Sequence, residues 1–176
     1  SRGLGDVYKR QIQNIYYGGT GIIGTMHNGS QIIGGAAFDA IGTIDTMSGG
    51  KQMIARGGTG TLSVMYVDGV PSILNGGTGT VSTMSGGVQF VSSNGVATIS
   101  SLIGGTQEVN SGGTALDTVI AGGTQLVSVD AVISGATLSA GIQQVYDGTK
   151  KDKKKMKAAL NIAVYYLSLI HISEPT

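Results

Sequence analysis

Residues 104–121 read GGTQEVNSGGTALDTVIA, and the next eighteen residues, 122–139, read GGTQLVSVDAVISGATLS. The two segments share their opening Gly-Gly-Thr-Gln and the placement of their aliphatic residues. A fixed period of this kind is typical of repeat architectures, in which each unit packs only against its neighbours. This repeat decides the fold, and it can be followed in both directions along the chain.

Earlier copies of the same pattern precede residue 104. GGVQFVSSNGVATISSLI covers residues 86–103, DGVPSILNGGTGTVSTMS covers 68–85, and GGKQMIARGGTGTLSVMYV covers 49–67. A still earlier copy begins with NGSQII at Asn28, so the copies are 21, 19 and then 18 residues long. Each copy has two halves, and each half opens on Gly-Gly or on a substitute such as Asn-Gly, Asp-Gly or Asp-Ala.

Similar residues recur at equivalent positions of successive copies and form three expected columns. The aliphatic column comprises Ile15, Ile33, Ile54, Ile73, Val91, Val109, Val127 and Val145. The glutamine column, which Pro71 interrupts, comprises Gln13, Gln31, Gln52, Gln89, Gln107, Gln125 and Gln143. The methionine column comprises Met26, Met47, Met65, Met84, Leu102, Ile120 and Leu138. Because Leu and Ile replace Met in the third column, it indicates core packing rather than thioether chemistry.

These patterns predict an all-β fold, a parallel β-solenoid with one coil per copy and about seven coils in the array. The apolar positions are rich in Val and Ile, alternate with Thr and Ser, and end at glycines, which is typical of short strands joined by tight turns. No copy shows the 3.6-residue period of a helix. Stacked coils would place equivalent side chains about 4.8 Å apart. Each apolar column then becomes a buried stripe, and the glutamines can form an amide ladder.

The segment SSNGVATISSLIGGTQEVNSGGTALDTVIAGGTQLVS, residues 92–128, resembles the repeats of AIDA-type autotransporter passenger domains. Their pattern is G-G-T-Q-x-V-x-S-G-G-T-A-x-x-T-x-I, which residues 104–120 match nearly throughout. The resemblance is close over residues 49–148 and looser over 12–48. It implies a right-handed β-helix exported to the surface of a Gram-negative bacterium. In that family such repeats form adhesins and self-association surfaces.

The two ends of the chain differ from the repeat. One DNA spelling of residues 1–11, SRGLGDVYKRQ, has a reverse complement that translates as LSLIHISEPTR, and its first ten residues are the sequence of residues 167–176. Such an inverted repeat is expected from a sequencing insert with untrimmed adapters, and both spellings resemble the adapter of a transposase-based library kit. We therefore expect residues 1–11 and 167–176 to be adapter-derived. Residues 12–149 are expected to be a β-solenoid array from a longer passenger.

Residues 150–166, KKDKKKMKAALNIAVYY, leave three interpretations open. They fit a short amphipathic helix lying over the open end of the solenoid. They also fit a degenerate last coil, since Met156 follows Leu138 by 18 residues, or a shifted reading frame. The lysines here contrast with residues 12–149, where Lys51 and Arg56 are the only basic residues in an acidic body. That balance makes the body a poor ligand for nucleic acid.

Two motifs with a ligand-binding meaning do not fit their context. Residues 19–24 match G-x-G-x-x-G, but the segment that follows lacks the helical pattern that a dinucleotide site requires. The segments GGTGTLSVM and GGTGTVSTM resemble a calcium-binding nonapeptide repeat. They place Leu62 and Val81 where that repeat needs an Asp ligand, so no calcium site is expected.

Residue types that carry catalysis are also sparse. There is no cysteine, and His27, the only histidine between residues 12 and 166, precedes Asn28-Gly29. We expect His27 in an exposed turn, without the further ligands that a metal site needs. A glycosidase needs two carboxylates a few ångströms apart on one face. The acidic residues do not share a slot and are not expected to converge: Asp45, Asp68, Glu108, Asp117 and Asp130.

The sequence therefore favours a non-catalytic structural or adhesive module of a bacterial cell-surface or secreted autotransporter passenger, with no cofactor or metal. The columns would build the rod, and flat polar faces would lie between them. Expected partners are surface glycans or proteins of a host or of bacteria, or further copies of the same protein. Neither nucleic-acid binding nor a membrane span is expected in this segment. The alternative is a β-helix carbohydrate-active or phage-tailspike-type protein, which predicts a carboxylate cluster on one lateral face.

Overall fold

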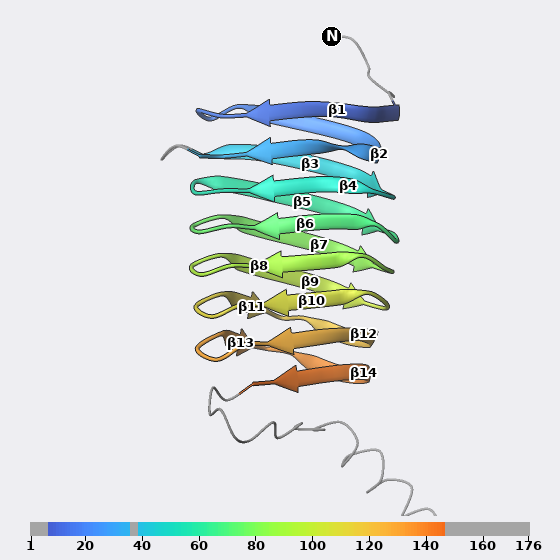
Figure 1. The fold of residues 1–176 in the computed structure, drawn as a ribbon, viewed down its shortest axis with the longest axis vertical. Coiled ribbons are helices and arrows are strands. Elements are labelled where there is room, and N and C mark those ends of the chain that lie inside the picture. The colour runs from blue at the N-terminus through green and yellow to red at the C-terminus, as the bar shows by residue number, and fades with distance from the viewer. Residues whose placement is uncertain (1–6, 36–38, 147–176) are drawn as a thin grey trace, which may run out of the picture.

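The computed structural model describes residues 7–35 and 39–146, with side chains from residue 12 onward. The chain winds into a rod of stacked coils, seen from the side in Figure 1. Fourteen strands form one continuous sheet in which neighbouring strands are parallel, with about seven coils in all. The predicted all-β parallel solenoid is therefore confirmed for this part of the chain, which contains no helix.

Each coil contributes one strand to each of two opposite faces. The odd face consists of β3 (Ala40–Met47), β5 (Gly58–Met65), β7 (Thr78–Met84), β9 (Val96–Leu102), β11 (Thr114–Leu116) and β13 (Val132–Ser134). The even face consists of β4 (Gly50–Ile54), β6 (Gly69–Ile73), β8 (Val88–Val91) and β10 (Thr106–Val109). Longer strands turn a corner and serve both faces: β1 (Val7–Ile15), β2 (Thr20–Ile33), β12 (Val119–Val127) and β14 (Thr137–Val145).

Strand formation follows from the two-residue alternation of apolar and polar side chains. In β8 and β10 each outward residue is followed by a buried one, Gln or Val. Val91, Val109 and Val127 are register partners in successive coils and are nearly or fully buried. Because the repeat length matches one coil, every inward residue lies above its equivalent and the apolar stripes become continuous.

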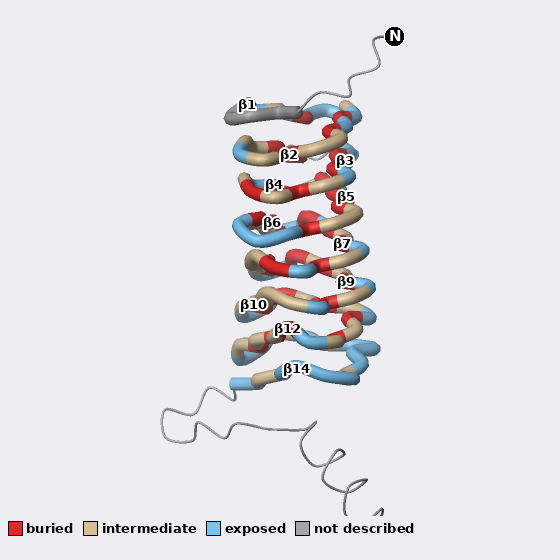
Figure 2. The backbone as a smooth tube through the Cα atoms, turned by 90° about the vertical axis from the view of Figure 1, so that its right-hand side faces the viewer, coloured by how far each residue is buried: buried red, intermediate tan, exposed pale blue. Residues whose placement is uncertain are grey.

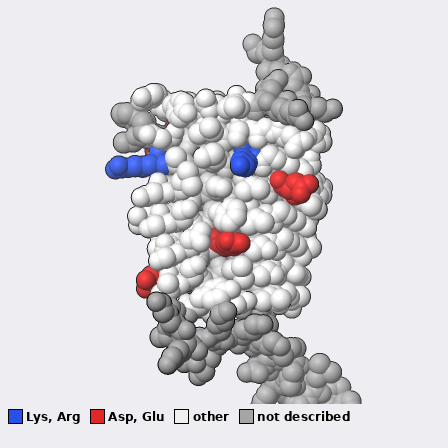
Figure 3. Space-filling model, viewed as in Figure 1, with Lys and Arg blue, Asp and Glu red and all other residues white. Residues whose placement is uncertain are grey.

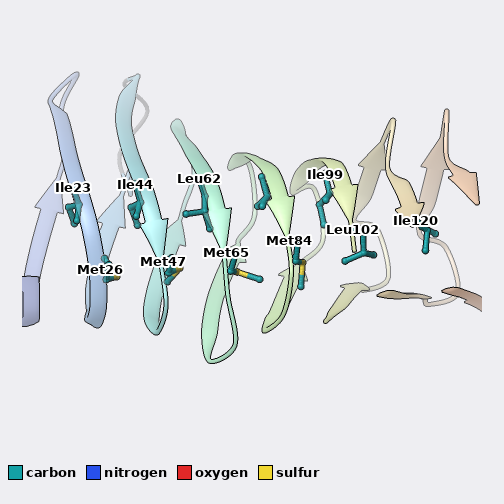
Figure 4. Packing of buried hydrophobic residues seen from close by; sticks show 11 residues of the cluster. Ile23, Met26, Ile44, Met47, Leu62, Met65, Met84, Ile99, Leu102 and Ile120 are labelled. Atoms are coloured by element: carbon teal, nitrogen blue, oxygen red, sulfur yellow. The ribbon is translucent and has the colours of Figure 1, made fainter. Parts of the chain in front are cut away.

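The inward residues form two apolar clusters. One contains the methionine column together with Ile23, Ile44, Leu62, Val81 and Ile99 of the odd face, as Figure 4 shows. The other contains the aliphatic column from Ile15 to Val109 together with Ala40, Ala97 and Ala115. Burial decreases in the last coil, where Val145 pairs with Val127 but is 38% exposed (Figure 2).

One corner of the coil requires a left-handed backbone. The residue that makes this turn has a φ between +56° and +72° in five successive coils, and it is Gly57, Gly76, Asn94, Gly112 or Asp130. In the first four of these coils its N–H donates to the carbonyl of its equivalent in the next coil, for example from Asn94 to Gly112 over 2.8 Å. Glycine, Asn and Asp are the residues that tolerate this conformation. The Gly, Asn or Asp that opens this half of each repeat is therefore required by the positive φ of the turn.

The strand β2 contains both His27 and most of the glycine-rich segment 19–24. His27 is not in an exposed turn, because it lies inside β2, is half-buried, and its Nδ1 is 2.5 Å from Oγ of Ser48 in the next coil. The prediction was wrong because the strand continues through Asn28-Gly29. Residues 20–24 lie within β2, so a strand rather than a helix follows Gly19, as expected.

The chain ends are described only in part. β1 begins at Val7, and its pairing with β2 is interrupted by two register shifts before continuous pairing starts at Ile12. The first six residues, the predicted short C-terminal helix within 150–166, and residues 167–176 lie outside the described residues.

Candidate interaction surface

The glutamine column forms a hydrogen-bonded ladder inside the rod. Nε2 of five glutamines donates to Oε1 of the glutamine one coil earlier, and these five bonds run in the same direction. The bonds are Gln31 to Gln13 (2.7 Å), Gln52 to Gln31 (2.9 Å), Gln107 to Gln89 (2.8 Å), Gln125 to Gln107 (2.6 Å) and Gln143 to Gln125 (2.6 Å). Gln31, Gln52, Gln89, Gln107 and Gln125 are at most 1% exposed. Their amides therefore depend on one another for hydrogen bonds.

Pro71 breaks this ladder, as its sequence predicts. It pairs with Gln52 of the preceding coil and has no side-chain amide to continue the chain. Nε2 of Gln89, in the following coil, is buried and has no hydrogen-bond partner among the described residues. An unsatisfied buried amide costs about 1–3 kcal/mol. The one irregularity of the column thus carries an energetic cost at a defined coil.

A column of small residues on the odd face lies opposite the aliphatic column. From Ile15 to Ile73 the facing residue is Gly, and for Val91 and Val109 it is Ala, whereas in the next coil Ile133 takes the position that Ala115 holds. The aliphatic residue is therefore one carbon smaller where the facing residue is one carbon larger. The total side-chain volume of the pair stays the same, and the space between the sheets stays filled. The facing pairs are Ile15 and Gly21, Ile33 and Gly42, Ile54 and Gly60, Ile73 and Gly79, Val91 and Ala97, and Val109 and Ala115.

We expect Gly79→Ala to lower the free energy of unfolding by about 1–3 kcal/mol, because it overpacks the interior. A Cβ added at Gly79 would lie 2.6 Å from Cγ1 and 2.8 Å from Cδ1 of Ile73. Ile73→Val alone should cost about 0.5–1.5 kcal/mol. The double variant should be within about 1 kcal/mol of the unmodified protein, because it recreates the native Val91 and Ala97 pair. Urea denaturation of the four proteins measures the coupling, and strictly additive effects would contradict the complementarity.

Two rows of outward residues on the odd face form what we call the threonine face. Within each row the residues are register partners from coil to coil. The first row is Thr20, Ile41, Thr59, Thr78, Val96, Thr114 and Val132, and the second is Ile22, Thr43, Thr61, Thr80, Thr98, Leu116 and Ser134. Every member is Thr, Ser or aliphatic, and all are exposed or half-buried. The two rows are therefore an uncharged lattice of hydroxyl and methyl groups with the strand spacing of about 4.8 Å between coils. A further outward position of β3, outside these rows, carries the exposed Asp45.

The outward residues of the even face are more varied. They include Lys51, Phe90 and Glu108 beside aliphatic and hydroxyl side chains such as Val88 and Thr106. Figure 3, which views the rod from this face, shows scattered charges separated by wide uncharged areas. The two faces of one coil thus present different chemistry to a partner.

The acidic residues lie at separate places in the fold. Asp45 is on β3, Asp68 makes the turn before β6, and Glu108 points outward from β10. Asp117 lies between β11 and β12, and Asp130 lies in the corner before β13. Among residues 7–35 and 39–146, no group of three or more His, Cys, Asp or Glu side chains is arranged to hold a metal ion. Leu62 and Val81, at the positions where a calcium repeat needs Asp, are buried in the core.

Thr118 is an interior residue that the sequence analysis did not identify. Asp117 adopts a positive φ of 49°, which interrupts the odd-face strand where earlier coils continue through Ile99. Thr118 is thereby turned inward, is fully buried, and its Oγ1 donates to Oε1 of Gln107 over 3.4 Å. The sequence signal for this buried position was the second Thr of the T-A-x-x-T-x-I pattern, which breaks the regular alternation of apolar residues seen in earlier coils.

These features define the class of protein as a parallel β-solenoid with a buried amide ladder and two uncharged rows of outward residues on one lateral face. No family model, curated protein or solved structure matches the chain. Within the part of the chain that the structure describes, there is no helix of the length and hydropathy needed to cross a bilayer.

Proposed function

We propose that the protein is a non-catalytic adhesive module of a bacterial surface or secreted autotransporter passenger, and that the threonine face is its contact surface. The observation that carries the proposal is the absence of charge from both rows of this face over seven successive coils, from Thr20 and Ile22 to Val132 and Ser134. Its hydroxyl groups can hydrogen-bond, while its methyl groups can pack against apolar patches.

The repeated geometry supports contact with an extended partner. A single Thr contributes little binding energy, but the second row offers a hydroxyl group in four successive coils, from Thr43 to Thr98, so weak contacts add along the rod. Glycan chains, the surfaces of other proteins and further copies of this rod all offer such extended contacts. The match of residues 104–120 to the AIDA-type pattern favours this class of activity and export to the cell surface.

The test is to display the whole chain on bacterial cells and to measure attachment to immobilised glycans, attachment to epithelial cells, and cell–cell aggregation. We expect Thr61→Lys combined with Thr80→Lys to lower at least one of these activities about tenfold, because two ammonium groups must be desolvated at the contact. Both residues are half-buried members of the threonine face.

The matched control is Thr106→Lys combined with Thr124→Lys on the even face. These threonines are also half-buried, lie in adjacent coils and are register partners. The control should keep its activity and its circular dichroism spectrum. Equal losses in both variants, or attachment indistinguishable from cells without the protein, would overturn the proposal. Sequencing the coding region beyond residue 166 with adapters trimmed tests the autotransporter context separately, since a translocator domain should follow in frame.

A further inference from the structure

We propose that the rod contains a built-in breakpoint between β6 and β8, where the even face opens while the odd face stays paired. The proposal rests on Pro71 and its surroundings, and it is independent of any adhesive function. Local opening of this kind is a sub-global fluctuation, with a lower free energy than unfolding of the whole rod.

The side chains provide the first argument. Pro71 occupies the position of the glutamine column, so the coil that contains it has no amide link to Gln52 on one side or to Gln89 on the other. We call the line of contact between two neighbouring even-face strands a seam. At the seam between β6 and β8, a buried donor, Nε2 of Gln89, lacks a partner among the described residues. Opening this seam lets water reach that donor, which offsets part of the cost of separation.

The backbone provides the second argument. β6 pairs with β4 along its whole length, from Gly69 to Ile73. Its pairing with β8 is restricted to Ser72 with Phe90 and Ile73 with Val91. The next seam, between β8 and β10, is paired over all four residues of both strands. Because proline has no N–H, it cannot supply a ladder hydrogen bond, and proline is unusual in a strand with neighbours on both sides.

The opposite side of the same coil shows no such weakness. β7 pairs with β9 in register from Thr78 with Val96 to Met84 with Leu102. The apolar cluster that contains the methionine column is continuous through this coil, with Met65, Met84 and Leu102 fully buried. The odd face therefore acts as the hinge. Opening on the even side exposes one edge of β8, with Val88 and Phe90, without dividing the rod.

Amide hydrogen exchange of the whole chain, read by NMR or mass spectrometry, tests the breakpoint. Residues 86–91 and 104–109 occupy equivalent positions in adjacent coils, so they form an internal comparison. We expect exchange about tenfold or more faster in 86–91. Equal exchange rates of the two segments in the unmodified protein would overturn the proposal.

Two variants make the test specific. Pro71→Gln supplies the missing N–H and an amide between Gln52 and Gln89, and it should slow exchange in 86–91 to the rate in 104–109. Gln occupies this position in the other coils of the column, so the site is shaped to accept it. Gln107→Pro should create a second fast segment at 122–127. Unchanged exchange in Pro71→Gln, or fast exchange that spreads equally over β7 and β9, would contradict the hinge.

Discussion

Deletion of residues 104–121 is expected to leave a folded rod that is one coil shorter. The deletion joins Ile103 to Gly122, places Gln125 beside Gln89, and places Val127 beside Val91, so both columns continue. The hydrogen bond between Thr118 and Gln107 lies wholly within the deleted segment, and neither partner is left behind. In a solenoid, stability is approximately a sum over coils and their interfaces. Circular dichroism per residue should be unchanged, and the melting temperature should fall by several degrees.

The control is deletion of half a coil, residues 104–112, which removes the β10 segment but keeps β11. Every later strand would then have to occupy the face opposite to the one it forms in the unmodified protein. Thr114–Leu116 falls where β10 was, and Gln125 no longer meets the glutamine column. We expect residues after 103 to lose protection from hydrogen exchange and from proteolysis, because their inward residues no longer match the coil below. Equal behaviour of the two deletions would show that coil register does not hold the fold together.

Gln107→Leu is expected to lower the free energy of unfolding by about 3–6 kcal/mol, a large share of the stability of a typical domain. Gln107 accepts hydrogen bonds from Gln125 and Thr118 and donates to Gln89. Its removal leaves Nε2 of Gln125, Oγ1 of Thr118 and Oε1 of Gln89 without these partners in the buried core. Each unsatisfied buried group costs about 1–3 kcal/mol. Chemical denaturation followed by circular dichroism measures the loss.

Gln89→Leu is the matched control, since Gln89 and Gln107 are both fully buried and lie in adjacent coils. It removes the donor that is already unsatisfied and frees Nε2 of Gln107 instead, so the number of unsatisfied donors is unchanged. We expect a loss of about 1 kcal/mol or less. A similar loss for both variants would mean that packing volume, rather than the amide ladder, determines the contribution of this column.

The periodic part of the structure was predictable because a solenoid repeats in space what the chain repeats in sequence. Val91, Val109 and Val127 recur every 18 residues and therefore stack, and the same argument placed Gln107 beside Gln125 and Met65 beside Met84. The break at Pro71 was also visible, since a column of one residue type makes an exception obvious.

Contacts across the interior were not predictable in the same way. The match of Ile73 to Gly79, and of Val91 to Ala97, joins residues on opposite faces of one coil, where no sequence period applies. The inward turn of Thr118 depends on the left-handed backbone of Asp117. Likewise, His27 lies in a strand because β2 continues through a segment whose composition is typical of turns.

The sequence by itself determined the coil, the strand alternation and the identity of the stacked columns, because the repeat length sets which residues become neighbours along the rod. Only the tertiary structure decided which columns face one another, which amide is left without a partner, and which uncharged rows lie side by side on the outer surface. Those features depend on the distance between the two sheets and on the direction of each corner. Both result from packing side chains of different volume into one closed interior.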